Sequence, residues 1–253
     1  MKIVANWKMN GTFRQSKDLL AEVTEFMASN LVVDKDVTVL ICPPTTMLSP
    51  MANKMRGRGL LFGGQDCHSQ ACGAFTGDVS PEMLVDAGAS YVIIGHSERR
   101  AKGETDEIIS NKVAMALEAG LHVVLCVGEK ERDEHGSHLE VLKAQIKDSL
   151  NKVPKKLIGK LVVAYEPVWA IGTGQTASPA DAQAMHQAIR AHLRAHDSRL
   201  EQTPILYGGS VKADNAVSLA ACPDIDGALV GGAALNAESF LSIAEAFAQA
   251  KRA

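Results

Sequence analysis

Short apolar runs rich in β-branched residues recur along the chain, separated by longer segments whose apolar positions fall at helical spacing. Near-continuous apolar runs are typical of strands covered on both faces, because a strand with one exposed face alternates apolar and polar residues. Strands that alternate with helices are expected to pair in parallel. The predicted strands cover residues 3–5, 37–41, 60–62, 91–94, 123–127, 161–165, 205–207 and 227–230.

Three polar segments carry the signals of helix N-termini. Ser80 and Ser178 each precede a proline and then an acidic residue, and Thr105 precedes two acids. A hydroxyl at this position accepts a hydrogen bond from the first turn, where proline and acidic residues are also favoured. The helix after Thr105 is expected to bury one face and to end at Gly120, with Ile108, Ile109, Val113 and Leu117 on that face.

Eight strand–helix units predict an α/β fold in which eight parallel strands close into a (β/α)8 barrel of about 250 residues. The chain has 253 residues without a linker, so we expect a single barrel domain over residues 1–253. The polar run 128–138 is predicted to start a surface helix. The alternative is an open doubly wound sheet, which usually carries Gly-x-Gly-x-x-Gly after its first strand, whereas residues 6–11 read Asn-Trp-Lys-Met-Asn-Gly.

The charge composition of the chain limits which classes of partner the protein is expected to bind. Lys and Arg (26) nearly balance Asp and Glu (29), and no dense basic run is present, so nucleic acid is not expected as a partner. No apolar stretch approaches the roughly 20 residues of a membrane span, and the N-terminus lacks a signal-peptide pattern. We therefore expect a cytoplasmic protein that does not bind membranes.

The five cysteines are expected to be reduced, because their number is odd and a chain of this size needs no disulfides. Asp66, Cys67, His68 and Cys72 resemble part of a metal site, but no second pair of ligands stands at a suitable spacing. The sequence therefore predicts no metal site.

The active site of such a barrel lies at the carboxyl ends of its strands. There the predicted sixth strand is followed by Glu166 and then by a loop that begins with Pro167 and contains Gly172. A carboxylate beside a loop that closes loses water and becomes a stronger base. The position indicates that Glu166 abstracts a proton.

Other strand ends deliver complementary groups. Asn6 and Lys8 follow the first strand, and His96 follows the fourth, just before Ser97, the expected N-cap of a helix. A helix N-terminus disfavours the imidazolium, so His96 is expected to be a neutral hydrogen-bond donor. The seventh and eighth strands end in glycine pairs whose N–H groups favour a phosphate, namely Gly208, Gly209 and the adjoining Ser210, with Gly231 and Gly232.

A carboxylate base, an imidazole donor, an ammonium and a phosphate site suit proton transfer between carbons next to a carbonyl, through an enediolate. Two other functions remain open. A Schiff-base aldolase would need a lysine where the sixth strand offers Glu166. A non-catalytic phosphate-binding or scaffold protein would not need both the base and the imidazole.

Six segments, in order and spanning nearly the whole chain, resemble the signatures of the triosephosphate isomerase family; they are residues 6–11, 73–77, 94–100, 164–174, 207–210 and 226–232. The resemblance implies a (β/α)8 barrel that interconverts dihydroxyacetone phosphate and D-glyceraldehyde 3-phosphate, in glycolysis and gluconeogenesis, without a cofactor. It also implies that the substrate is a small phosphorylated triose.

The resemblance assigns roles to individual residues. It implies that Glu166 is the base and that His96 moves a proton between the two substrate oxygens. Lys8 and Asn6 would contact the substrate, and Glu98 would support the catalytic groups. The remaining implied roles are phosphate binding by Gly172, Ser210, Gly231 and Gly232, and support or lid movement by Ser97, Pro167, Trp169 and Tyr207.

The family resemblance further implies a homodimer. The loop of residues 65–79 would insert beside the active site of the partner, with Thr76 at its tip, and Asp78 would pair with Arg99 of the partner subunit. This chain has Asp78 where the family usually has Glu, and Gln175 where a Lys commonly begins the second lid hinge. The first departure is expected to weaken an interface ion pair and the second to alter lid kinetics.

Overall fold

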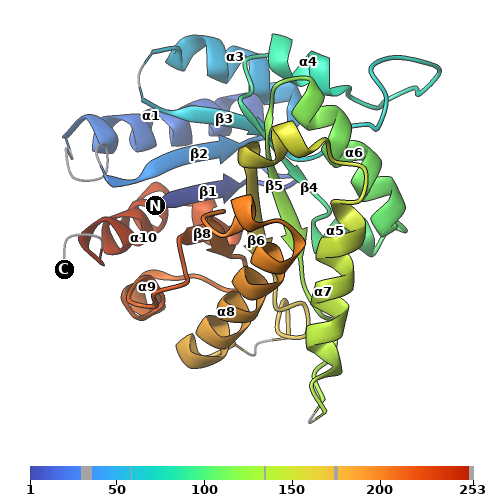
Figure 1. The fold of residues 1–253 in the computed structure, drawn as a ribbon. Helices are drawn as coiled ribbons and strands as arrows, with labels where there is room; N and C mark the ends of the chain where they lie inside the picture. Colours follow the sequence, from blue (N-terminus) through green and yellow to red (C-terminus); the bar gives the residue numbers. More distant parts are fainter. Residues whose placement is uncertain (30–35, 58, 134, 174–175, 251–253) are drawn as a thin grey trace.

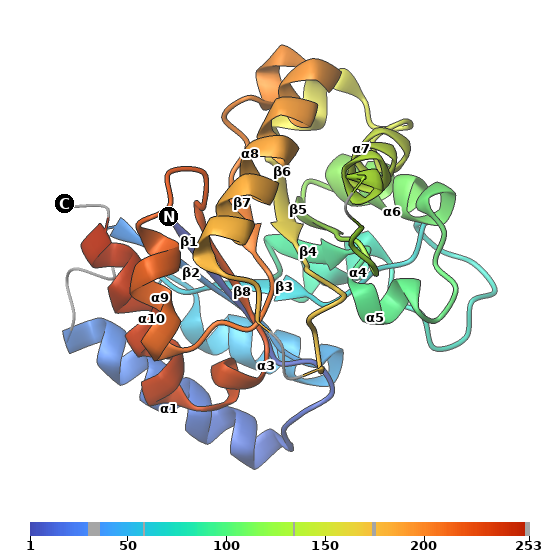
Figure 2. The same cartoon turned by 90° about the horizontal axis from the view of Figure 1, so that it is seen from below.

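The computed structural model describes residues 1–29, 36–57, 59–133, 135–173 and 176–250. It contains a closed barrel of eight parallel strands, in which each strand pairs with its sequence neighbours and β8 pairs with β1. Helices surround the strands on the outside (Figures 1 and 2). The predicted α/β barrel is confirmed, and the open doubly wound sheet is wrong. The strands are β1 (Lys2–Asn6), β2 (Thr38–Cys42), β3 (Leu61–Gly64), β4 (Tyr91–Ile94), β5 (His122–Val127), β6 (Leu161–Tyr165), β7 (Ile205–Tyr207) and β8 (Gly227–Val230).

Two cores explain why the strands are apolar on both faces. Successive residues of a strand point to opposite sides. In β1, Val4 belongs to the cluster inside the barrel, whereas Ile3 and Ala5 pack with the surrounding helices. The interior cluster also contains Leu40, Cys42, Tyr91, Ile93, Val124, Cys126, Val162, Ala164, Leu206 and Leu229.

The helix signals read from the sequence are confirmed at three N-termini. Ser80 accepts a hydrogen bond from the Met83 N–H, and Thr105 accepts one from the Ile108 N–H at the start of Asp106–Glu118. Ser178 forms a reciprocal capping box with Asp181. The helices are α1 (Phe13–Ser29), α3 (Thr45–Met55), α4 (Pro81–Asp86), α5 (Ser97–Arg100), α6 (Asp106–Glu118), α7 (Ser137–Ser149), α8 (Pro179–His196), α9 (Ala213–Ala220) and α10 (Ala237–Ala250). The 3-10 helices are Lys155–Lys160, Ser198–Leu200 and Gly232–Leu235.

One detail of the helix predictions is wrong. Ile108 is 40% exposed, whereas Ile109, Val113 and Leu117 are buried, because position 108 faces a cavity rather than the barrel. The polar run 128–138 contains the predicted start of a helix, since α7 begins at Ser137. None of the described helices is both long and apolar enough to cross a membrane.

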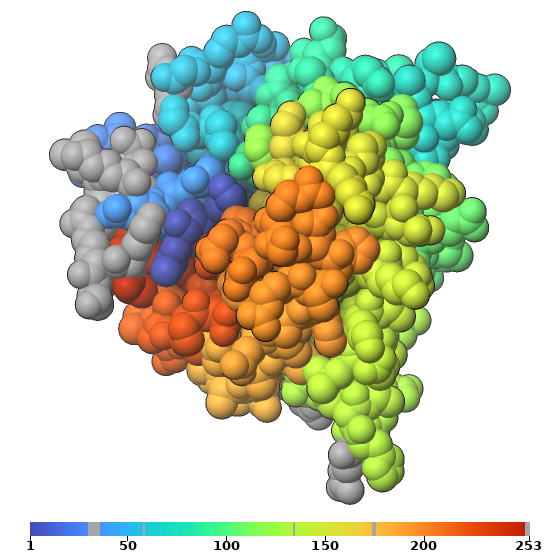
Figure 3. All heavy atoms as spheres, viewed as in Figure 1, coloured from blue at the N-terminus to red at the C-terminus, as the bar shows by residue number. Residues whose placement is uncertain are grey.

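The segment between β3 and α4 leaves the body of the molecule as a long loop (Figures 1 and 3). Its ends are joined by a hydrogen bond of 2.8 Å from the His68 N–H to the Val79 carbonyl. At its tip, the Asp78 N–H donates to the Phe75 carbonyl at 3.0 Å, which closes a turn around Thr76 and Gly77. Gly77 has a φ of 94°, which suits glycine at this corner. The loop therefore has a defined shape.

His186 on α8 is a buried titratable group behind the carboxyl ends of β6 and β7. It is fully buried against Tyr165 and Tyr207, and its Nδ1 lies 3.1 Å from the Asp224 carbonyl. Burial lowers the pKa of His186 from 6.5 to about 4. Between these two values the unfolded chain binds a proton that the folded chain excludes, so this group makes stability fall as the pH falls.

We predict that His186→Asn flattens the acid limb of the stability curve. The Asn amide can still donate to the Asp224 carbonyl but does not titrate. Between pH 7 and pH 4.5 the free energy of unfolding should fall by about 2–3 kcal/mol more in the parent than in the variant. Urea unfolding at fixed protein concentration measures both. Parallel pH dependences would show that His186 does not contribute.

Candidate active site

A cavity of about 640 Å³ opens at the carboxyl ends of the strands. It brings together the predicted base, imidazole, ammonium and both glycine pairs, from segments far apart in the sequence. Its lining includes Asn6, Lys8, His96, Glu166, Gly172, Gly208, Gly209, Ser210, Gly231 and Gly232. Of the predicted support residues, Ser97, Glu98, Pro167, Trp169 and Tyr207 contact this set from outside the lining or lie next to it in the chain.

Glu166 follows β6 directly, and its N–H donates to the Val127 carbonyl of β5 at 2.8 Å. The residue is only 2% exposed, so its carboxylate is almost completely desolvated. The Ser97 N–H donates to Oε2 at 2.9 Å and the Ser97 hydroxyl to Oε1 at 2.8 Å. The Nε2 atom of His96 lies 3.2 Å from Oε1. These donors hold a buried carboxylate beside the imidazole.

The protonation of His96 follows from its hydrogen bonds. Its Nδ1 accepts the Glu98 N–H at 3.2 Å, so Nδ1 carries no proton and the proton of the neutral ring is on Nε2. His96, not Ser97, is therefore the N-cap of α5, because the Ser97 hydroxyl is engaged by Glu166. The four-residue α5 thus acts on His96 through a direct hydrogen bond from its first turn.

Lys8 adopts a left-handed backbone conformation, with a φ of 52°, which is uncommon for a residue other than glycine. Its N–H donates to Asn6 Oδ1 at 3.0 Å, and its carbonyl accepts from Gln65 Nε2 at 2.8 Å. Its ammonium donates to Glu98 Oε1 at 2.6 Å. Burial alone would raise the pKa of Glu98, but the hydrogen bond and charge of Lys8 bring it below the usual value. The strained loop thus fixes an ammonium at the mouth of the cavity.

Gly208 and Gly209 leave no room for a side chain. A Cβ on Gly208 would lie 3.0 Å from the Tyr165 carbonyl oxygen, and one on Gly209 would lie 2.3 Å from the Tyr207 hydroxyl. A Cβ on Gly231 would lie 3.4 Å from the Lys8 side chain, whereas Gly232, which begins a 3-10 helix, faces open space. Backbone N–H groups at such turns suit an anion such as phosphate.

The loop after Glu166 contacts a buried carboxylate just after β5, that of Glu129. Its Oε1 accepts from the Trp169 indole at 2.9 Å, the Tyr165 hydroxyl at 2.8 Å and Arg132 at 2.9 Å. Gly172, with a φ of 76°, lines the main cavity. Burial raises the pKa of Tyr207 to about 12, so its hydroxyl stays neutral. Gln175, in the second hinge, lies outside the described residues, as does Gly174.

Gln65, Glu129 and Lys212 are residues that the sequence patterns did not identify. Gln65 follows β3 directly and donates to the carbonyls of Lys8 and Cys42. Glu129 lies two residues beyond β5, and Lys212 lines the main cavity just after Ser210. The strand-end rule, applied to the third and fifth strands as well, would have identified the first two.

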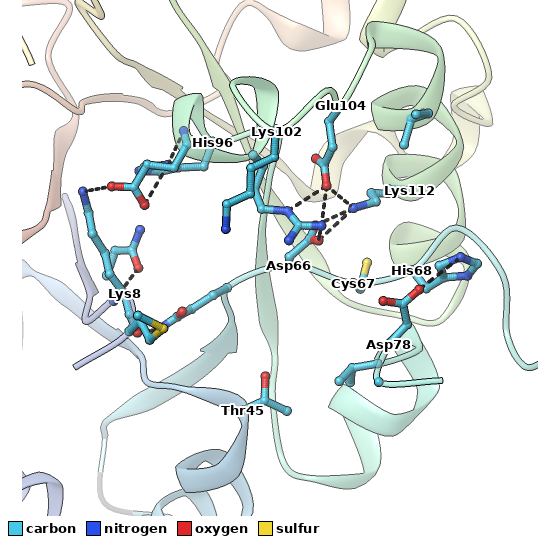
Figure 4. A pocket seen from close by; sticks show the side chains of 18 residues that line it. Lys8, Thr45, Asp66, Cys67, His68, Asp78, His96, Lys102, Glu104 and Lys112 are labelled. Atoms are coloured by element: carbon cyan, nitrogen blue, oxygen red, sulfur yellow. Dashed lines mark hydrogen bonds and ion pairs between the residues drawn. The ribbon is translucent and has the colours of Figure 1, made fainter. Parts of the chain in front are cut away.

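A second cavity, of about 490 Å³, adjoins the first and shares Asn6, Lys8 and His96 with it. Figure 4 shows a group of charged side chains on its far side, where Lys112 contacts both Asp66 and Glu104. Further members and neighbours are Arg99, which pairs with Asp66 and Glu104 of its own chain, and Asp78, whose carboxylate lies 3.6 Å from His68. The ion-pairing capacity of Arg99 is therefore already used in part within one chain. All five cysteines are free in the structure.

Comparisons with known proteins find similarity over nearly the whole chain. The sequence profile of the family described as triosephosphate isomerase matches residues 1–247. A triosephosphate isomerase of Roseiflexus castenholzii is 49% identical over 245 residues, which cover 95% of each chain. One from Sodalis glossinidius is 47% identical over 99% of this chain and 98% of its own, and one from Xanthomonas campestris pv. campestris is 48% identical over 98% of both.

We predict that Lys212→Gln weakens the binding of inorganic phosphate to the main cavity. Lys212 is an exposed cation beside Ser210, so it should attract the dianion by a modest, salt-screened interaction. Affinity should fall about two- to fivefold at low ionic strength and converge with the parent in high salt. Titration calorimetry at two salt concentrations measures this, with Lys54→Gln on α3 as the control. A loss equal in both variants, or independent of salt, would contradict the prediction.

Proposed function

The chain belongs to the triosephosphate isomerase family, and we propose how its residues perform the reaction of that family. The protein is an isomerase of glycolysis that interconverts dihydroxyacetone phosphate and D-glyceraldehyde 3-phosphate and needs no cofactor. Its substrate is a phosphorylated triose. We infer that residues 1–253 act as one catalytic domain, because pairing of β8 with β1 closes the barrel.

One observation carries the assignment of catalytic residues: the carboxylate of Glu166, a residue with 2% exposure, lies 3.2 Å from Nε2 of the His96 imidazole. We propose that Glu166 leaves Ser97 and takes a proton from the carbon beside the substrate carbonyl. The electrons of the C–H bond form the carbon–carbon double bond of the enediolate, and the carbonyl electrons move to oxygen. The protonated Glu166 then returns its proton to the neighbouring carbon.

His96 serves the two oxygens in the same proposal. Its Nε2–H donates a proton to the oxygen that becomes negative, and Nε2 regains one from the neighbouring hydroxyl. The ammonium of Lys8 and the amide of Asn6 stabilise the negative charge at the same end of the cavity. Glu98 holds Lys8 in place through its bond of 2.6 Å, which makes it a supporting residue.

We place the substrate phosphate at the other end of the cavity. The support is the set of backbone N–H groups at Gly172, Ser210, Gly231 and Gly232, which all line it. Pro167 and Trp169 form the first hinge of a lid, with Tyr207 beneath it and Glu129 holding the indole. A closed lid excludes water from the enediolate.

We also propose that the protein is a cytoplasmic homodimer. The projecting loop with Thr76 at its tip would insert into the second cavity of the partner subunit. This cavity has a volume of about 490 Å³ and lies beside Lys8 and His96. Met9, at the rim of that cavity, is 95% exposed, which is unusual for a large apolar side chain unless a partner covers it. The glycolytic role and the reduced cysteines support a cytoplasmic location.

We predict that Glu166→Gln lowers kcat about 1000-fold, because an amide cannot accept the proton. Affinity for a phosphate ester that cannot isomerise should stay within about twofold, since the phosphate site is untouched. Conversion of D-glyceraldehyde 3-phosphate, coupled to a dehydrogenase that consumes the product, measures turnover, with exposed Glu118→Gln on α6 as the control. A variant that keeps more than about a tenth of the parent activity would remove Glu166 from the mechanism.

We predict that Thr76→Arg both loosens the dimer and lowers activity, because a long charged side chain at the loop tip must be desolvated inside the cavity of the partner. Sedimentation across a concentration series and activity at the same concentrations test this together. Ser198→Arg, exposed in the 3-10 helix Ser198–Leu200, is the control. A fully active, dimeric Thr76→Arg variant would place the interface elsewhere.

A further inference from the structure

The main chain of Glu166, the proposed base, contacts the end of β5. The Glu166 N–H donates to the Val127 carbonyl at 2.8 Å, and the next residue, Gly128, lies directly against the Glu166 carbonyl. A Cβ on Gly128 would stand 1.8 Å from that carbonyl oxygen, so the two main chains leave no space between them. Any shift of the Gly128 peptide must therefore move Glu166.

One side chain from outside the barrel holds Gly128. Gln145, half-buried on α7, accepts the Gly128 N–H at Oε1 at 2.8 Å and donates from Nε2 to the Gly128 carbonyl at 3.0 Å. Because both hydrogen bonds come from one planar amide, they fix the position and the orientation of Gly128. The helix itself is anchored, because Leu142 and Ile146 on either side of Gln145 are buried in the core.

We propose that Gln145 is a positioning residue for the catalytic base: its paired hydrogen bonds to Gly128 set where the Glu166 carboxylate stands relative to His96. The inference rests on the proposed role of Glu166 as the base. Proton transfer depends steeply on geometry, and a misplacement of about 1 Å can lower the rate about 100-fold. Three of the four residues proposed to bind phosphate, Ser210, Gly231 and Gly232, follow β7 and β8, whereas both hydrogen bonds of the Gln145 amide go to Gly128, after β5. Gln145 should thus act on the chemical step and leave substrate binding alone.

The chain offers a matched control in Gln183 on α8. It too is half-buried. Its Oε1 accepts the Asp224 N–H at 3.1 Å, and its Nε2 donates to the Asp224 carboxylate at 2.6 Å. Asp224 precedes β8, on the side of its amino end, and does not line the main cavity. Replacement of Gln183 therefore removes two comparable hydrogen bonds and leaves the contacts of Gly128 with Glu166 unchanged.

The test compares Gln145→Met with Gln183→Met, since Met keeps the side-chain length and loses both hydrogen bonds. In Gln145→Met we expect kcat to fall about 10- to 100-fold. KM and affinity for a phosphate ester that cannot isomerise should both stay within about twofold of the parent. The primary deuterium isotope effect on proton abstraction should rise, because that step becomes slower. Gln183→Met should keep kcat within about twofold, while urea unfolding shows a comparable loss of stability in both variants.

Three outcomes would overturn the inference: an unchanged kcat in Gln145→Met, an equal loss of kcat in Gln183→Met, or a loss of phosphate-ester affinity that parallels the loss of kcat. The Glu166→Gln variant separates this inference from the proposed function. If Glu166→Gln is inactive and Gln145→Met is normal, only the positioning role fails. If Glu166→Gln is active, the base assignment itself fails.

Discussion

The closure of the strand ladder between β8 and β1 is the constraint on which the rest of the structure depends. Lys2 pairs with Gly227, and a Cβ on Gly227 would stand 1.8 Å from the Lys2 carbonyl oxygen, so the two strands meet where only glycine fits. Because all eight strands are parallel and the sheet has no edge, their carboxyl ends share one rim. Residues as distant in sequence as Lys8 and Gly231 thereby come together, and a Cβ on Gly231 would touch the Lys8 side chain at 3.4 Å.

Burial of a carboxylate at this end of the barrel carries a large desolvation free energy unless hydrogen-bond donors surround it. Ser97 supplies two hydrogen bonds to Glu166, and both come from the first residue of α5. The same short helix orients His96, because the Glu98 N–H occupies Nδ1 and leaves the proton on Nε2. A single four-residue helix therefore holds the base, sets the imidazole tautomer and, through the Glu98 side chain, fixes the Lys8 ammonium.

The sequence predicts best what local burial decides and worst what depends on distant contacts. β4 and β6–β8 begin and end where predicted, because their apolar runs stop where the chain leaves the barrel. Ser97 was wrongly expected to be an N-cap, since nothing local reveals that Glu166, 69 residues away, engages its hydroxyl. Ile108 has a core-like spacing but faces a cavity. The amide of Gln145 looks like any helix-surface residue until the fold brings Gly128 against it, 17 residues earlier in the chain.

The end of β5 and the two residues after it contact both the proposed base and the proposed lid. Four successive residues each have a different partner. The Cys126 carbonyl accepts from Arg100, the Val127 carbonyl accepts from the Glu166 N–H, Gly128 is hydrogen-bonded to Gln145, and Glu129 accepts from the Trp169 indole. In the proposed mechanism, movement of the lid breaks the bond between Trp169 and Glu129, while the main chain of Glu166 keeps its contacts with Val127 and Gly128. The two sets of contacts are separable because they lie on adjacent residues but involve different hydrogen bonds.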